Sequence, residues 1–228
     1  MKQLADQAIV LSRLDYGEAA RIVTFLTKTH GKISAMAKGV RKPKSKLAGG
    51  IELFSVADIT YIEGKSDIKT LVTAQVHTHY GSIASDISRS MTAYDTLKYT
   101  NLYTETICED EYFALLHAAL AALNDVTAAP ELVWVWFGVR LLEQSGHGLN
   151  LATDPRGAQL NPDDQFMFDY QDMAFYAHQG GVFTSRHIKL LRLCQRTRFA
   201  TVQSVAGAPA IAKELRQLIA ECTKFYSR

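Results

Sequence analysis

Long apolar runs and cysteines are both scarce in this sequence. No segment approaches the ~20 consecutive apolar residues that a membrane-spanning helix needs. The first residues, MKQLADQAIVLSRL, include Asp6 and are too weakly apolar for a signal peptide. The three cysteines, Cys108, Cys194 and Cys222, are odd in number and far apart. They therefore argue against a disulfide framework and predict reduced thiols in a cytoplasmic protein.

The common catalytic motifs are also missing. The chain has no P-loop, no dinucleotide fingerprint, no His-Glu-x-x-His and no Gly-x-Ser-x-Gly. Asp163 and Asp164 could serve a metal-dependent nuclease, but Asn-Pro-Asp-Asp is first of all a turn sequence. His77 and His79 would share a strand face, yet no cysteine lies nearby to complete a zinc site. The sequence thus predicts neither catalysis nor a bound metal or other cofactor.

Acidic residues are absent from one stretch of the chain. Between Lys28 and Lys46 there are seven basic residues and no Asp or Glu. The formal net charge of +2 hides this, because residues 1–80 carry +5 and the remainder carries −3. Charge that is segregated in this way indicates a polyanionic partner for the first third of the chain.

Five short runs rich in β-branched and aliphatic residues predict β-strands in residues 1–80. They cover residues 8–14, 21–27, 30–39, 53–64 and 66–76. Five strands in so short a segment are typical of an OB-fold barrel, whose faces and loops often bind oligonucleotides. A five-stranded SH3-like barrel would give a similar pattern. Periodicity alone does not separate the two, so we expect an α+β protein whose residues 1–80 form a nucleic-acid-binding β-barrel of the OB-fold or SH3-like kind.

From about residue 82 the hydrophobic period becomes helical. Ile83, Ile87, Met91, Tyr94 and Leu97 predict an apolar stripe on a first helix. Further helices are expected over residues 110–125, 130–146, 185–199 and 209–226, the third of these apolar almost all round and therefore central. An Asp-rich segment at about 147–184 interrupts this helical domain (81–228), and its two aromatic runs, FMFDY and MAFYA, predict a small hairpin.

The basic stretch AKGVRKPKSKLAGG is the main candidate binding site. Its cations are Lys38, Arg41, Lys42, Lys44 and Lys46. Several mobile cations with no nearby carboxylate are what phosphate binding requires, because counterion release rewards each contact. A solvated loop without a partner is the alternative.

Other residues of the barrel could extend this site. Lys32, Arg13 and Arg21 could lengthen the phosphate-binding footprint. Tyr16 and Tyr61, in a turn and near a strand end, are the candidate stacking platforms for bases. Phe25 and Phe54 lie in apolar runs and are expected in the core.

A second group of cations recurs at helical spacing after the Asp-rich segment. Arg186, Lys189 and Arg192 would share one face of a helix. An acidic partner peptide could dock there if an apolar groove lies alongside. A solvated helix face, or pairing with the upstream aspartates, is the alternative.

The N-terminal block resembles the start of the RecO family of bacterial DNA repair and recombination mediators. The shared elements are Tyr16-Gly17-Glu18, Thr27 with Gly31-Lys32, Ala37-Lys38-Gly39-Val40-Arg41, Ser45-Lys46-Leu47 and Leu53-Phe54. Further along, FGVRLLEQSGHGLNL and GGVFTSRHIKLLR are similar to later helical segments of the family.

This resemblance implies an OB domain, a helical domain and no chemical catalysis. It implies binding of single- and double-stranded DNA, annealing of complementary strands, contact with the acidic C-terminal tail of single-strand binding protein, and RecA loading with RecR. Many members carry a four-cysteine zinc site where this chain has residues 146–185 and no cysteine. An RNA-binding OB-fold factor, or a nuclease using Asp163 and Asp164, are the alternatives.

Overall fold

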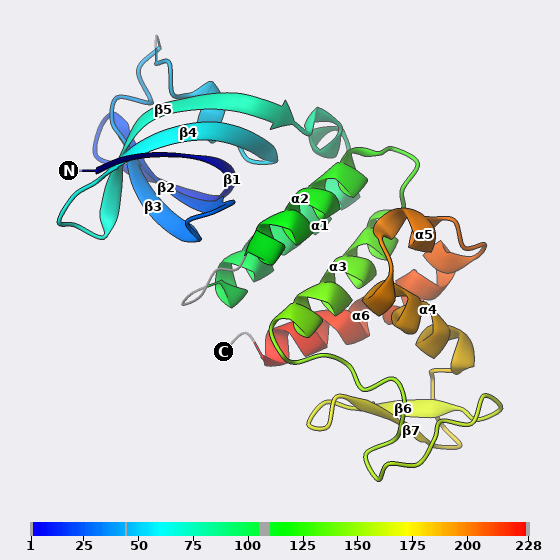
Figure 1. Cartoon of the computed structure of the whole chain (residues 1–228). Coiled ribbons are helices and arrows are strands. Elements are labelled where there is room, and N and C mark those ends of the chain that lie inside the picture. Colours follow the sequence, from blue (N-terminus) through cyan, green and yellow to red (C-terminus); the bar gives the residue numbers. More distant parts are fainter. Residues whose placement is uncertain (1, 44, 105–109, 227–228) are drawn as a thin grey trace. The chain divides into compact units, whose positions relative to one another are not determined.

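The computed structural model describes residues 2–43, 45–104 and 110–226, which form two compact units, 1–124 and 125–228 (Figure 1). At residue 80, where we expected the domain boundary, the chain changes from strand to helix. The two helices that follow it are grouped with the barrel in the first unit. Among the described residues, no helix has the length and apolar character needed to cross a membrane.

The first unit begins with a closed five-stranded barrel. Its strands are β1 (Lys2–Tyr16), β2 (Ala20–Thr27), β3 (Lys32–Ala37), β4 (Ser55–Glu63) and β5 (Ile68–His79). They are hydrogen-bonded in the order β1-β2-β3-β5-β4, and β4 closes the ring on β1. In the described part of the barrel, β3 and β5 pair in parallel and the other neighbouring strands pair antiparallel. This OB-type barrel confirms the predicted fold class, and β1 starts six residues earlier than its apolar run suggested.

Alternating side chains fill the barrel. Val10, Val23, Phe25, Ile59 and Tyr61 belong to one buried cluster inside it. The short 3-10 helix η1 (Gly49–Ile51) caps this cluster with Ile51. Gly50 is required at that place, because a Cβ there would lie 2.4 Å from the backbone of Ala74. Gly50, at the end of the basic stretch, thus lets the chain close over the barrel.

A second 3-10 helix, η2 (Gly81–Ser85), leads into α1 (Ile87–Tyr103) and α2 (Asp110–Asn124), which pack against one another. The apolar residues that recur at helical spacing in α2, among them Phe113, Leu116 and Leu120, are buried. The stripe predicted for α1 is wrong except at Leu97. Ile87 is 80% exposed, and Met91 and Tyr94 are exposed as well. The buried face instead carries Thr92, Ala93, Thr96, Leu97 and Thr100. Small side chains on this face permit close packing of the helix. The hydroxyl of Thr96 donates a hydrogen bond to the backbone carbonyl of Ala93 within the same helix.

The second unit is a helical bundle with a hairpin. Its elements are α3 (Pro130–Gln144), β6 (Phe166–Asp169), β7 (Ala174–Ala177), α4 (Ser185–Arg196), α5 (Phe199–Gln203) and α6 (Ala208–Phe225). The apolar α3 is buried along most of its length and packs against α4 and α6 (Figure 1). Gly138 allows this, because a Cβ there would meet Ile219 of α6 at 2.3 Å. The predicted hairpin is confirmed by the antiparallel β6–β7 pair.

Candidate nucleic-acid interface

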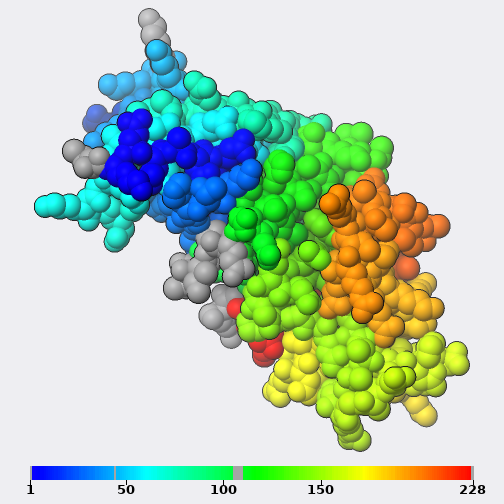
Figure 2. Space-filling model, in the orientation of Figure 1, coloured from blue at the N-terminus to red at the C-terminus, as the bar shows by residue number. Residues whose placement is uncertain are grey.

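The basic loop runs from the end of β3 to η1 and projects from the barrel surface (Figures 1 and 2). Tight turns shape it: the amide of Lys42 donates to Gly39 O at 3.1 Å, and that of Ser45 donates to Lys42 O at 3.0 Å. Gly39 has φ +68°, which favours glycine. The amide of Arg41 donates to Ala19 O at 3.2 Å, so the loop is fastened to the β1–β2 turn.

Three loop lysines remain available to a ligand. Lys38, Lys42 and Lys46 are exposed, and none of them has an ion pair or a side-chain hydrogen bond within the part of the chain that the structure describes. Lys44, also predicted to contact phosphates, lies outside the described residues. Unpaired ammonium groups on a projecting loop can reach phosphates without first breaking a contact within the protein.

The arginines of the site are already paired with carboxylates. Arg21 Nε lies 2.7 Å from Asp15, Arg41 lies 3.8 Å from the same carboxylate, and Arg13 lies 2.7 Å from Glu52. The hydrogen bond from Arg21, with the charges of Arg41 and Arg13, holds the pKa of Asp15 below its ordinary value. The loop has no acid of its own, but the fold brings carboxylates beside it.

Lys32 has a structural contact. Its ammonium donates to the carbonyl of Asn101 at 2.7 Å, near the C-terminal end of α1. Carbonyls at that end of a helix carry partial negative charge and attract a cation. Lys32 therefore ties β3 to α1, and DNA could engage it only at the expense of that bond.

The two tyrosines predicted to stack on bases differ in their exposure to solvent. Tyr16 is 57% exposed at the end of β1, so its ring is available for stacking. Tyr61 as a stacking platform is wrong: it is 1% exposed and lies in the barrel core, where burial raises the pKa of its phenol. The alternation along β4 puts Tyr61 on the same inner face as Ile59. Phe25 and Phe54 are buried, as predicted.

Sequence inspection missed an apolar strip on the outer face of the barrel. Leu14 is 65% exposed and pairs across the sheet with Ile22, which in turn pairs with Met36. Ile22 and Met36 are partly exposed. A bulge between Val10 and Ser12 shifts the strand register, so that Leu14 and Tyr16 share the outward face. An irregular strand of this kind cannot be identified from a simple alternating pattern.

The three predicted cations of α4 differ in whether they already have partners within the protein. Arg186 pairs with Glu214 at 2.8 Å, and Arg192 Nε donates to Leu151 O at 2.9 Å. Lys189 is exposed and has no ion pair or hydrogen bond to the described residues. None of the three pairs with an aspartate of the segment 147–184 in the described structure.

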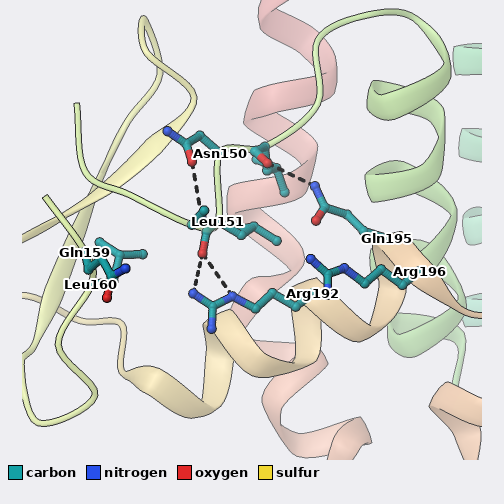
Figure 3. A pocket seen from close by; sticks show the side chains of 9 residues that line it. Asn150, Leu151, Gln159, Leu160, Arg192, Gln195 and Arg196 are labelled. Atoms are coloured by element: carbon teal, nitrogen blue, oxygen red, sulfur yellow. Dashed lines mark hydrogen bonds between the residues drawn. The ribbon is translucent and has the colours of Figure 1, made fainter. Parts of the chain in front are cut away.

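A cavity of about 530 Å³ lies beside Arg192 (Figure 3). Its lining residues are Leu149, Asn150, Leu151, Ala152, Gln159, Leu160, Arg192, Gln195 and Arg196. The exposed wall is more polar than apolar, and no carboxylate belongs to it. This cavity is therefore not the apolar groove that docking of an acidic peptide beside Arg192 would require.

Asp163 and Asp164, the aspartates considered for a nuclease site, lie in a hydrogen-bonded turn. The side chain of Asn161 accepts the amide of Asp163 at 3.2 Å, and its carbonyl accepts the amide of Asp164 at 3.1 Å. His77 lies 3.2 Å from Asp58. Across residues 2–43, 45–104 and 110–226 there is no group of three or more His, Cys, Asp or Glu side chains that could hold a metal ion. Nothing described in the structure supports the nuclease alternative.

Comparison with known proteins gives two family matches that together cover most of the chain. Residues 1–80 match the model "Recombination protein O N terminal", and residues 101–228 match "Recombination protein O C terminal".

Individual relatives agree with these matches. The DNA repair protein RecO of Salinibacter ruber is 25% identical over 228 residues, covering 96% of this chain and 86% of the relative. That of Bifidobacterium longum is 35% identical over 163 residues, covering 67% and 65%. That of Myxococcus xanthus is 32% identical over 139 residues, which is about half of each chain (57% and 54%). With both family models matched in order over most of its length, the chain belongs to the RecO family of non-enzymatic DNA repair and recombination proteins.

Proposed function

We propose that this protein is a DNA-binding mediator of recombinational repair that holds single- and double-stranded DNA by the backbone and promotes annealing of complementary strands. The observation that carries the proposal is the set of unpaired lysines on the projecting loop, Lys38, Lys42 and Lys46, fastened beside the β1–β2 turn and the exposed ring of Tyr16. Lysine contacts to phosphate position a strand without reading its sequence.

The proposed site combines charge with stacking. Phosphates would meet the loop lysines, while bases would stack on Tyr16 and lie against the apolar strip that contains Leu14. Single-strand binders commonly combine such a basic path with aromatic platforms. Binding of this kind screens the repulsion between two backbones, which is the main barrier to bringing complementary strands together.

Partners are proposed on the strength of the family alone. We propose that the protein acts with RecR to load RecA, and that it contacts the acidic C-terminal tail of single-strand binding protein. A RecA-loading assay on coated single-stranded DNA, with and without RecR, tests this. Loading that is independent of the protein would contradict it.

Binding of a fluorescent single-stranded oligonucleotide across a salt series tests the DNA site. The variant Lys38→Ala/Lys42→Ala/Lys46→Ala should bind more weakly, and its slope of log affinity against log salt should flatten by about 2, at ~0.7 per single-strand phosphate. The control Lys2→Ala/Lys65→Ala/Lys213→Ala removes three exposed lysines outside the basic stretch and should retain the wild-type slope. Equal slopes for both variants would remove the loop from the site. Tighter binding of RNA of the same sequence would favour an RNA-binding factor.

A further inference from the structure

We propose that the face of α4 that carries Lys189, Arg192 and Arg196 is a second phosphate-binding site, which takes the backbone of a second nucleic-acid strand. This inference rests on the proposed function, because a second strand matters only if the barrel binds the first. It concerns the second unit alone, where a mainly polar cavity lies beside the part of this face that carries Arg192 and Arg196 (Figure 3).

The spacing of these cations matches a polyanionic chain. Lys189, Arg192 and Arg196 stand at i, i+3 and i+7, so they follow one face of α4. At 1.5 Å rise per residue they span about 10 Å. One strand of a nucleic acid carries a charge about every 3.4 Å along a helix axis, so the face covers roughly three phosphates. Arg186 does not belong to it, because Glu214 neutralises that end of the helix.

Arg192 is held in place before any ligand arrives. Its Nε and one Nη donate to the carbonyl of Leu151, which leaves the other Nη free to bond to an anion (Figure 3). The side chain of Asn150 accepts the amides of Ala152 and Thr153, and this fixes the segment that carries that carbonyl. A guanidinium positioned in this way loses little rotamer freedom on binding, which favours affinity.

Arg196 contributes a guanidinium group that is not already paired within the described protein. It is exposed, it points into the same hollow as Arg192 in Figure 3, and within the described residues it has neither an ion pair nor a hydrogen bond. The neighbouring Gln195 donates its amide to Leu149 O at 2.9 Å and to Glu143 at 3.2 Å. Glu143 is thereby engaged and does not line the cavity. A planar guanidinium with five donors suits a phosphate oxyanion well.

The wall of the cavity favours a nucleic-acid backbone over an acidic protein segment. A peptide that ends in apolar residues needs an apolar slot for them, whereas this wall is mainly polar. A phosphodiester chain needs donors and an absence of carboxylates, and the lining meets both needs. With one strand on the barrel and one on α4, a single molecule would present two strands for pairing.

Annealing measured beside binding tests the second site in the full chain. The variant Lys189→Ala/Arg196→Ala removes two exposed charges and leaves Arg192 on Leu151. We expect its affinity for a first oligonucleotide to stay within about twofold of wild type, because removing the α4 contacts leaves the barrel contacts intact. Its annealing rate should fall at least about tenfold, as expected when two phosphate contacts are lost. The control Lys213→Ala/Lys224→Ala makes the same charge change on α6 and should anneal like wild type.

Two results would overturn this inference. One is annealing by the Lys189→Ala/Arg196→Ala variant at the wild-type rate while first-strand binding is intact. The other comes from the arginine Nε–Hε NMR signals of Arg192 and Arg196, if an acidic peptide with a free C-terminal carboxylate shifts them and a 5′-phosphorylated thymidine dinucleotide does not. Failure of the wild type to bind any strand would be a different result, because it removes the proposed function itself.

Discussion

The guanidinium of Arg21 lies 2.7 Å from the carboxylate of Asp15, directly across the β1–β2 pair. Arg41 of the basic loop approaches the same carboxylate at 3.8 Å. Asp15 therefore pairs with two arginines, Arg21 and Arg41, that could otherwise bind DNA phosphates. It competes with phosphate at the edge of the proposed site.

Replacing this carboxylate should strengthen DNA binding. Asp15→Asn would free Arg21 and Arg41, so that affinity at low salt should rise and the salt slope should steepen by about 0.7 for each cation that gains a single-strand phosphate. Fluorescence anisotropy across a salt series measures both quantities. The matched control is Glu63→Gln, which removes the partner of Lys69 on the barrel and should change neither. Weaker binding by Asp15→Asn would mean that Asp15 positions the arginines for DNA.

The exposed ring of Tyr16 should contribute by stacking. Tyr16→Ala should cost about 1–3 kcal/mol of single-strand binding, whereas Tyr16→Phe keeps the ring and should bind like wild type. Titration of a fluorescent oligonucleotide with the three proteins measures the difference. Equal loss in both variants would assign the effect to the hydroxyl group instead of the ring.

Tyr61 should matter for stability and not for binding. Because its ring is buried in the barrel cluster, Tyr61→Ala should lower the free energy of unfolding by about 3–5 kcal/mol, in the range found for large aromatic truncations. Urea denaturation followed by circular dichroism measures this. If the folded variant lost DNA affinity while its unfolding midpoint stayed the same, the core assignment would be contradicted.

Gly49 and Gly50, which precede Ile51, should respond differently to substitution by alanine. A Cβ at Gly50 would lie 2.4 Å from the backbone of Ala74, whereas a Cβ at Gly49 would meet nothing within 4 Å. Gly50→Ala should therefore destabilise the barrel by about 1–3 kcal/mol or more, because backbone must move. Gly49→Ala should be close to neutral. Thermal unfolding of the pair checks the prediction, and equal melting temperatures would show that η1 does not approach β5 this closely.

Asp6 should make stability depend on pH. Burial raises the pKa of its carboxyl, but hydrogen bonds from the Thr29 hydroxyl, His30 and the amides of Thr29 and Gln7 outweigh burial and hold the pKa below its ordinary value. A folded-state pKa that is lowered favours the folded protein above the unfolded-state pKa. This stabilisation is lost as pH falls through the folded value.

The corresponding measurement is urea unfolding of wild type and Asp6→Asn between pH 6 and pH 2.5. The wild type should be more stable by about 1–3 kcal/mol at the upper end, as for a hydrogen-bonded charge, and the difference should shrink below about pH 4. The exposed Asp67→Asn serves as the control and should follow the wild type throughout. A difference between wild type and Asp6→Asn that grows on acidification would reverse the sign of this argument.

Local patterns predicted most of the architecture. The five strand segments, the buried stripe of α2, the central α3 and the small hairpin all follow from apolar periodicity and turn residues, which act over a few positions. The α1 stripe failed for a physical reason: Thr92, Thr96 and Thr100 have small side chains that allow close packing, and Thr96 donates its hydroxyl to the backbone carbonyl of Ala93. This small face is therefore buried, and Ile87 stays in solvent.

The charge of residues 28–46, the order of strand and helix segments and the family motifs are properties of the sequence itself, because each depends on residues that are close together in the chain. Which cations remain available to a ligand was decided only by the tertiary structure. Asp15, Glu52 and Asn101 are distant in sequence from Arg41, Arg13 and Lys32, and only barrel closure and the packing of α1 bring them together. The same folding buries Tyr61, leaves Tyr16 exposed and turns Leu14 outward through a bulge, because strand register and not local composition sets the direction of each side chain.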